Sequence, residues 1–465
     1  MGSGSRKAMT KEKVFQPLAI HYRPHKQRIF SNKHEPPIGS KIPNPSIKSH
    51  HQVAPACPPM DMQEMENPKA STDHQLEPRD TYRVAYVIHF LLGAGNLLPW
   101  NAFITAVDYF GYLYPAKHVE KVFSVGYMST SVLVLVVMMS SGSCCGTNLA
   151  LTRRFRLNMG FSTFLLSLMV APTIDWVWQG GWSEEKQSAA YFMTVTAVVI
   201  CGLADGLIAG SLIGSAGKLP KQYMQAIFAG TASSGVLVSI LRITTKASLP
   251  QTPAGLRASA HFYFIVSATI QLCCILCCNL LYKLPVMQQH YRILGDDPFC
   301  SSPQFWTVAR KICWPALGIL MIYVVTLSIF PGFIAENLES KFLRDWYPVL
   351  LITVYNVADF MGKSLTAIYV LQSIKKATWA CISRLLFYPL FTACLHGPKW
   401  LKGEIPVVVL TFMLGLTNGY LTSVLMILAP KTVPVSEAEL SAIVLVVFLG
   451  IGLVGGSVLG WFWII

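Results

Sequence analysis

The chain has 465 residues, of which 53% are hydrophobic and only 13% are charged. Soluble domains carry about 25% charged residues, so this composition excludes an ordinary soluble enzyme. The formal net charge of +14 does not indicate a nucleic-acid-binding protein, because the basic residues are divided between a tail and short loops rather than gathered on one face. We therefore interpret most of the chain as membrane-embedded and expect no nucleic acid partner.

Residues 1–79 form an N-terminal segment that is rich in His, Lys, Pro and Ser and lacks apolar periodicity. Such a segment cannot bury enough apolar surface to offset the entropy lost on ordering, so we predict a disordered tail. The first 50 residues contain no apolar run of the length found in secretory signals. We therefore expect the first apolar helix to direct insertion and to remain in the membrane.

Eleven apolar segments follow, each close to the roughly 20 residues needed to cross a hydrocarbon core of about 30 Å. They are residues 84–106, 121–140, 155–174, 189–213, 223–243, 260–282, 312–333, 346–370, 377–396, 405–428 and 440–463. The sequence therefore predicts an all-α membrane protein with a six-helix bundle at 80–282, a central loop at 283–311 and a five-helix bundle at 312–465. Two bundles facing each other would enclose a substrate site near mid-membrane.

Lys and Arg are more frequent in the loops on the same side as the tail, for example at Arg153, Arg154 and Arg156. Cytoplasmic loops carry such an excess, so we expect the N-terminal tail and the central loop in the cytoplasm. An odd number of spans then places the C-terminus outside.

Two small-residue patterns indicate packing rather than chemistry. Four cysteines, at 273, 274, 277 and 278, lie in an apolar segment without His or carboxylate, so we expect buried or lipid-facing thiols and no metal site. Small residues four positions apart share a helix face and let another backbone approach closely. These stripes are Gly206, Gly210 and Gly214; Ala226, Gly230 and Ser234; and Gly452, Gly456 and Gly460.

Polar side chains inside apolar helices are costly and are therefore the main functional candidates. Asn356, Asp359 and Lys363 recur at spacings of three and four, which places them on one helix face. One interpretation is a structural ion pair that neutralises itself. The other is a substrate-facing stripe, in which the carboxylate and the ammonium exchange their mutual contact for ligand hydroxyls.

Asp205 has no charged neighbour in its own segment, and a buried carboxyl of this kind is suited to take up and release a proton. The alternative is a permanent partner on another helix, either Arg242 or Lys363. With Asp359, it is a candidate for coupling transport to protons.

Three further charged residues lie near the expected cytoplasmic end. We expect Arg384 either to bind lipid headgroups or to close an inner gate with Glu437 or Glu439.

In the first apolar segment, Trp100 and Asn101 offer a stacking plane next to an amide.

The chain contains no Walker loop, so a pump that hydrolyses ATP within this chain is excluded and transport must use gradients. It also shows no nucleophile, base and oxyanion constellation, and we expect neither an enzyme nor a cofactor. A membrane scaffold or receptor is an alternative, although a scaffold has no reason to bear the desolvation cost of buried Asp and Lys side chains.

Six runs in order, from about residue 79 to the C-terminus, resemble the equilibrative nucleoside transporter family, and within it the plant type 1, proton-coupled members. The runs are GAGNLLPWNAFITAVDYF (93–110), GSLIGSAGKLPKQYMQAIFAG (210–230), SIFPGF (328–333), YNVADFMGKSLTA (355–367), RLLFYPLF (384–391) and GLTNGYLTSVLMILAPKTV (415–433). The resemblance implies a major-facilitator-like fold with one helix missing. It also implies that Trp100 and Asn101 border a nucleoside site, and that Asn356, Asp359 and Lys363 hold the ribose.

The resulting hypothesis is alternating-access import of purine and pyrimidine nucleosides, coupled to protons. Simple facilitation and a carrier of nucleobases or organic cations stay open as alternatives. We expect the protein in the plasma membrane, with the vacuolar membrane as the alternative. Nucleosides, protons and the lipid bilayer are the expected partners, and no obligate protein partner is inferred.

Overall fold

The computed structural model describes residues 80–463 except for 81, 116, 142–148, 178–183, 296–304, 331–342, 399–400 and 402. The expected tail at 1–79 lies outside the described residues. The first eight helices are α1 (Val84–Thr105), α2 (Val107–Leu113), α3 (Val119–Ser141), α4 (Leu149–Val177), α5 (Glu184–Gly217), α6 (Lys221–Ser248), α7 (Pro253–Leu281) and α8 (Pro285–Gly295).

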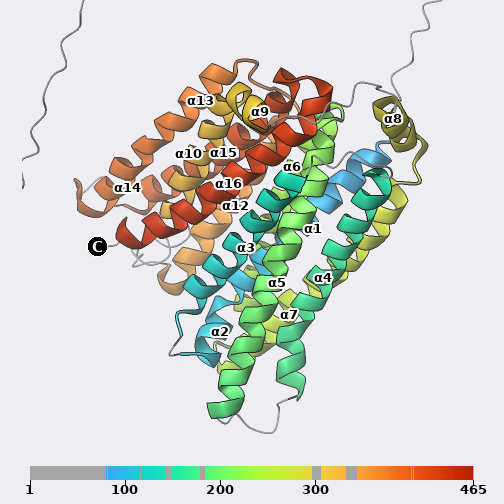
Figure 1. Ribbon diagram of the computed structural model, residues 1–465. Coiled ribbons are helices and arrows are strands. Elements are labelled where there is room, and N and C mark those ends of the chain that lie inside the picture. The colour runs from blue at the N-terminus through green and yellow to red at the C-terminus, as the bar shows by residue number, and fades with distance from the viewer. Residues whose placement is uncertain are drawn as a thin grey trace, which may run out of the picture. The chain divides into compact units, whose positions relative to one another are not determined.

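The second half of the described chain is also helical (Figure 1). Its helices are α9 (Phe305–Lys311), α10 (Cys313–Ile329), η1 (Arg344–Trp346), α12 (Tyr347–Leu365), α13 (Ile374–Ser383), η2 (Arg384–Leu386), α14 (Phe387–His396), α15 (Glu404–Leu428), η3 (Ala429–Thr432) and α16 (Val435–Trp463). The described residues contain no strand, so the expected all-α class is confirmed.

Each of the eleven expected spans coincides with a helix or a helix pair. Within the described residues, nine helices are long and apolar enough to cross a membrane, and the pair α9 and α10, bent by 75°, makes up to ten. The span expected at 346–370 corresponds to α12, which is not among these candidates because it carries Asn356, Asp359 and Lys363. The count of eleven therefore stays a prediction.

Two closely packed helix pairs lie in each half: α1 with α6 and α3 with α5 in the first half, and α12 with α15 and α10 with α16 in the second. Glycines explain the close approach, because a side chain at Gly230 would meet the carbonyl oxygen of Phe90 on α1, and one at Gly206 would meet that of Ser131 on α3. Gly456 packs in the same way against α10. Gly206, Gly230 and Gly456 are therefore confirmed as points of backbone contact between helices, whereas a side chain at Gly210 or Gly214 would meet the side chain of Met138 or Ile443.

Fewer helices connect the two halves. Helix α6 packs against α12, and α16 packs against α3 and α5. We call these contacts between the halves seams. They bring together residues more than a hundred positions apart in the sequence, and the candidate site lies on the α6–α12 seam.

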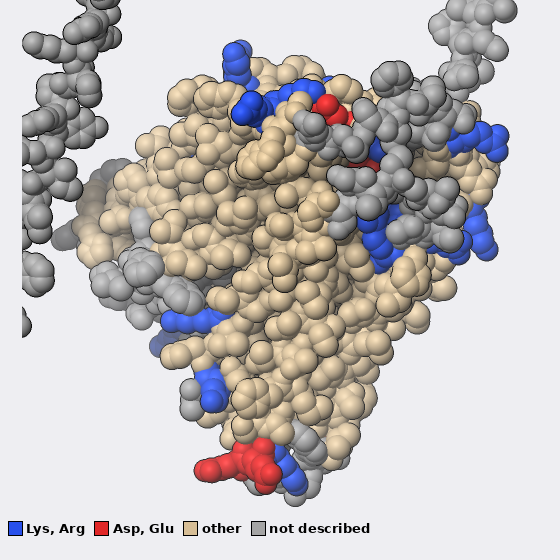
Figure 2. Space-filling model, in the orientation of Figure 1, with Lys and Arg blue, Asp and Glu red and all other residues tan. Residues whose placement is uncertain are grey.

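The outer surface of the helices is apolar, as expected for contact with lipid. Exposed large side chains include Leu166, Phe192, Leu276 and Ile405. Figure 2 shows, on one face, charged side chains gathered toward two opposite ends with a broad uncharged region between them. On α7, Cys274 and Cys278 are buried and Cys273 is exposed, all as free thiols, which agrees with their expected role as apolar side chains.

We predict that Gly419→Ala lowers the stability of the protein by about 1–3 kcal/mol, because the new methyl group would lie less than 3.0 Å from the backbone oxygen of Asp359, which cannot move without shifting α12. Gly111→Ala on α2 is the matched control, because a side chain there meets nothing within 4 Å. Thermal unfolding of the purified protein in detergent measures both. Equal unfolding midpoints for the two variants would contradict the packing described above.

Candidate functional site

The centre of the candidate site is an ion pair on one face of α12. Lys363 Nζ lies 2.9 Å from Asp359 Oδ2, one helical turn away, and both side chains are buried. The other carboxylate oxygen, Oδ1, accepts a hydrogen bond of 2.7 Å from Asn418 Nδ2 on α15. Lys363 also donates to Thr231 Oγ1 on α6 at 3.4 Å, so groups from both halves meet at this pair.

A polar chain extends from Asn418 away from the pair. Asn418 Oδ1 accepts from the hydroxyl of Thr326 on α10 at 2.9 Å, and Thr326 Oγ1 accepts from Arg384 Nη2 at 2.7 Å. Arg384 Nη1 donates to the backbone oxygen of Leu414 at 3.1 Å and to the hydroxyl of Thr417. The chain thus joins η2, α10, α15 and α12 in the interior of the second half.

The side chain of Asn356 contacts α6, whereas that of Asp359 contacts α15. Its Nδ2 donates to the backbone oxygen of Gly235 at 3.2 Å and to Ser239 Oγ at 2.9 Å, both on α6. In this conformation Asn356 therefore joins the two halves at the α6–α12 seam, one turn from the ion pair.

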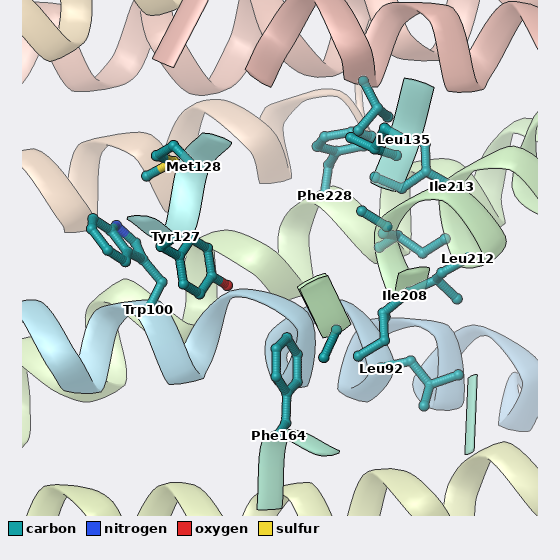
Figure 3. Packing of buried hydrophobic residues seen from close by; sticks show 14 of the residues in the cluster. Leu92, Trp100, Tyr127, Met128, Leu135, Phe164, Ile208, Leu212, Ile213 and Phe228 are labelled. Atoms are coloured by element: carbon teal, nitrogen blue, oxygen red, sulfur yellow. The ribbon is translucent and has the colours of Figure 1, made fainter. Parts of the chain in front are cut away.

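The two candidates on α1 face other helices of the first half. The indole of Trp100 packs on the ring of Tyr127 from α3, with 4.8 Å between ring centroids, as Figure 3 shows. Asn101 Nδ2 donates to Ser234 Oγ on α6 at 2.8 Å. Trp100 is 8% exposed, so its ring is almost fully covered in this conformation.

Asp205 on α5 bonds to neither of the two basic residues considered as its partners. Its Oδ2 accepts from Ser131 Oγ on α3 at 2.6 Å, and the phenol of Tyr127 lies beside it. Arg242 instead pairs with Asp108, and Lys363 pairs with Asp359. Among the described residues, Asp205 forms no ion pair.

The structure separates Arg384 from the two glutamates with which it was expected to form a gate. Arg384 is 2% exposed, which also excludes contact with lipid headgroups in this conformation. Neither expected contact is made in this conformation, because position along a helix indicates depth but not the face on which a side chain lies. Arg384 begins the short η2 segment between α13 and α14 and points inward to α10 and α15.

The glutamates pair with other basic residues at the start of α16. Glu439 Oε2 lies 2.9 Å from Lys218 Nζ at the end of α5 and 3.3 Å from Arg153 Nη2 on α4. Glu437 Oε2 lies 2.7 Å from Lys311 Nζ on α9. Only the Glu439 cluster joins the two halves, and it lies at the end of the helices expected to face the cytoplasm.

The segment at 283–311 between the two halves also contacts the Glu439 cluster, through α8. The guanidinium of Arg153 lies 5.5 Å from the ring centroid of Tyr291 on α8, which is a cation–π distance. Burial raises the pKa of the Tyr291 phenol, so the ring stays neutral beneath Arg153. The segment expected as a loop at 283–311 therefore contains a helix that covers one side of the Glu439 cluster.

Sequence reasoning missed Asn418, Thr326 and Thr231. Each is an uncharged polar residue in an apolar helix, and such residues are too common in membrane helices to stand out by type. A signal was present for Asn418, because it lies directly before Gly419 and one turn after Gly415, where another backbone must approach. Arg153 was considered only for its contribution to the charge of the loops.

Two apolar grooves lie away from these residues. One, of about 480 Å³, lies between α4 and α5. The other, of about 390 Å³, is lined mainly by apolar residues, most of them on α12: Ile243, Trp346, Val349, Leu350, Thr353, Val354, Val357 and Phe412. Neither groove includes Asp359 or Lys363. Asp359 and Lys363 are 7% and 4% exposed, so packed helices enclose the ion pair in this conformation, and a ligand would reach it only after the halves move.

Comparison with known proteins identifies the family. A model of a family described as nucleoside transporter matches residues 195–297 and 296–465. The chain belongs to this nucleoside transporter family. It is 68% identical to equilibrative nucleotide transporter 8 of Arabidopsis thaliana, over 84% of this chain and 98% of the relative. It is 48% identical to equilibrative nucleotide transporter 1 of the same plant, over 83% of this chain and 88% of the relative.

Solved structures with the same arrangement of helices come from the major facilitator superfamily. A proton:xylose symporter bound to 6-bromo-6-deoxy-D-glucose has a TM-score of 0.55 at 13% identity, covering 82% of this chain and 86% of the symporter. A fucose:proton symporter of E. coli has a TM-score of 0.53 at 13% identity, covering 81% and 89%. Such low identity shows the fold alone. Family and fold together make this nucleoside transporter family member a multi-pass membrane transporter and not an enzyme, as the sequence predicted.

We predict that Glu439→Gln destabilises the protein by up to about 3 kcal/mol, because it leaves the nearly buried guanidinium of Arg153 without its carboxylate. Glu437→Gln is the matched control on the same helix, since its partner Lys311 is 41% exposed and such pairs contribute about 0–1 kcal/mol. The unfolding midpoints of the two variants are compared at low and high salt. A larger loss for Glu437→Gln would show that the Glu439 cluster is not the stabilising contact.

Proposed function

We propose that this family member moves purine and pyrimidine nucleosides across the membrane by alternating access, in an import that is coupled to protons. The observation that carries the proposal is the buried pair of Asp359 and Lys363 at the α6–α12 seam. A buried ion pair is not by itself stabilising, since the desolvation of both charges offsets most of their attraction. Its presence in a transporter is accounted for if the two groups bind a substrate.

The chemistry of the pair fits a ribose. Vicinal hydroxyls offer both donors and acceptors, and the carboxylate of Asp359 accepts only while the ammonium of Lys363 donates only. A ribose that enters between them replaces one contact of 2.9 Å with several hydrogen bonds, so neither charge is left without a partner. Asn356, one turn away, exposes a further amide when the seam to α6 opens.

The nucleobase would bind on the side of the first half. Trp100 presents a large aromatic ring, and aromatic rings stack on planar bases whatever their hydrogen-bond pattern. Asn101 next to it provides an amide that now bonds to Ser234. A site built from a stacking ring and an amide accommodates both purines and pyrimidines.

Alternating access requires the two halves to separate at one end at a time. The Glu439 cluster joins α16 to α4 and α5 at the end assigned to the cytoplasm, so this conformation is closed on that side. Opening to the cytoplasm breaks these ion pairs and the hydrogen bond of Lys363 to Thr231. Glu439 with Arg153 and Lys218 thereby takes the gating role that was expected for Arg384.

Proton coupling is assigned to Asp205 or Asp359. The groups facing Asp205 are the hydroxyls of Ser131 and Tyr127 from α3 and the thiol of Cys201 on its own helix, all of them neutral. Tyr127 packs on Trp100, so a change of charge at Asp205 acts on a ring next to the base site. The proposed location is the plasma membrane, with the tail and the central loop in the cytoplasm.

Uptake of labelled adenosine into transport-deficient cells that express the chain tests the substrate. We expect saturable uptake that uridine inhibits, and a loss of at least about tenfold in Asp359→Asn and Lys363→Gln at equal surface expression, because each leaves one buried charge unpaired. Adenine and AMP serve as competitors that lack the ribose or add a phosphate. Full inhibition by adenine but not by uridine would indicate a nucleobase carrier instead, and preferential inhibition by AMP a nucleotide carrier.

Current measurements test the coupling. In the parent protein we expect adenosine to evoke an inward current that grows as the outside becomes more acidic, and this current to disappear in Asp205→Asn while unlabelled adenosine still exchanges for labelled adenosine. Asp108→Asn is the control, because Asp108 is half exposed and paired with Arg242. Uptake without current in the parent would show simple facilitation.

A further inference from the structure

Arg384 is a buried charge that forms no ion pair with a carboxylate among the described residues. Its guanidinium is 2% exposed, and the partners described for it are the backbone oxygen of Leu414, the hydroxyls of Thr417 and Thr326, and the ring of Phe387 at 5.6 Å. All of these are neutral. A buried guanidinium is costly unless it is paired, so this arrangement calls for an explanation.

The carboxylate that is linked to Arg384 is Asp359, two side chains away. Arg384 donates to Thr326 (2.7 Å), Thr326 donates to Asn418 (2.9 Å), and Asn418 donates to Asp359 (2.7 Å). The two intervening side chains, Thr326 and Asn418, are 1% and 3% exposed, and Asp359 is 7% exposed, so water does not replace these bonds. Hydrogen bonds in such a chain polarise one another in a medium of low dielectric constant.

The donor-to-acceptor direction of this series of hydrogen bonds is set by the groups at its two ends. A guanidinium has no acceptor, so Thr326 must accept from Arg384, and its own proton is then free for Asn418 Oδ1. The Asn418 amide consequently turns its NH₂ group to Asp359 Oδ1. At the other oxygen, Oδ2, the Lys363 ammonium also donates only. Both oxygens of Asp359 therefore face donors that cannot accept a proton from it.

The opposite direction is the competing arrangement. The Thr326 hydroxyl also lies 2.7 Å from the backbone oxygen of Ile322, and if its proton went there the Asn418 amide would turn its oxygen to Asp359. Asp359 would then have to be protonated in order to donate. That state places a neutral acid beside Lys363 and leaves two cations, Lys363 and Arg384, in the same enclosed region without an anion, which burial strongly disfavours.

We propose that Arg384 is a positioning residue for the substrate site, which acts through Thr326 and Asn418 to hold Asp359 as an ionised acceptor. The inference rests on the proposed role of Asp359 in binding the ribose. It assigns Asp359 a fixed charge throughout the transport cycle and leaves the uptake of a proton to Asp205. It also explains why Arg384 is buried in the second half at a place where no gate is formed.

The titratable and charged groups that face Asp359 are few. Lys363 and Tyr355 come from its own helix, Tyr323 comes from α10, and Arg384 lies at the far end of the chain. The side chain that approaches Lys363 from α6 is Thr231, which does not titrate.

Equilibrium binding of labelled adenosine to the purified full chain, between acidic and neutral pH, tests the inference. Thr326→Val keeps the shape of the side chain and removes the hydroxyl that links Arg384 to Asn418. We expect binding to weaken about tenfold at acidic pH and much less at neutral pH, because the Asn418 amide is then no longer held with its NH₂ group toward Asp359 Oδ1. Thr326→Ser restores the hydroxyl and should restore the profile. Thr392→Val is the control, because Thr392 is exposed and bonds only to its own helix.

A double variant distinguishes a positioning role of Arg384 and Thr326 from a purely structural role. In an Asp359→Asn background, Thr326→Val should cause no further change, because no carboxylate remains to be held in its ionised form. An effect that is equal at all pH values and that adds fully to Asp359→Asn would overturn the inference. If Thr326→Val is not recovered as folded protein, Arg384→Lys gives the same test, since one ammonium cannot make both the Thr326 and the Thr417 contacts. Unchanged adenosine binding in Asp359→Asn alone would instead refute the substrate role of Asp359, and the inference with it.

Discussion

The close approach of the α12 and α15 backbones is the constraint on which the candidate site depends. Gly415, Gly419 and Gly362 lie against backbone atoms of the facing helix, where any side chain would be excluded. Asn418 lies between the two α15 glycines in sequence, and this contact brings its amide to 2.7 Å from Asp359. A helix pair held at a side-chain distance would leave that carboxylate with a single partner. The same residues that pack the second half thus determine how its buried charge is satisfied.

The contacts within the halves differ in part from those between them, although Gly217 at the end of α5 also lies against the backbone oxygen of Ala438 on α16. Within each half, glycines press backbone on backbone, and such contacts have no alternative partner if the helices separate. Between the halves, Asn356 bonds to Ser239, Lys363 to Thr231 and Glu439 to Arg153 and Lys218. Water or substrate can take over each of these hydrogen bonds. The protein therefore divides into units that hold together and seams that can open, which is the physical requirement for alternating access.

The sequence was sufficient for features that depend on one helix at a time. Apolar length located the long helices but not the short α2, α8 and α9. Small-residue spacing located packing faces, and the spacing of four between Asp359 and Lys363 placed the ion pair on one helix face. Features that depend on the rotation of one helix against another were not accessible. Arg384 and Glu439 both carry charges near helix ends, yet they face different neighbours because their helices present different sides to the interior. Hydrophobic periodicity is weak in helices that contact lipid on one side and protein on the other, so it does not fix that rotation.

Two acids within the helices of the transporter, the buried Asp359 and the partly exposed Asp205, are set in opposite surroundings. Asp359 lies between two cations, one in direct contact and one linked through Thr326 and Asn418, and the loss of its charge would leave both without an anion. Asp205 faces only hydroxyls and a thiol, so either protonation state finds hydrogen-bond partners there. Burying a lone charge is costly, whereas burying a neutral acid costs little, and a proton taken up by Asp205 removes that cost. A substrate anchor must keep its charge and a proton carrier must lose it, and neighbouring groups of this kind allow one protein to maintain both.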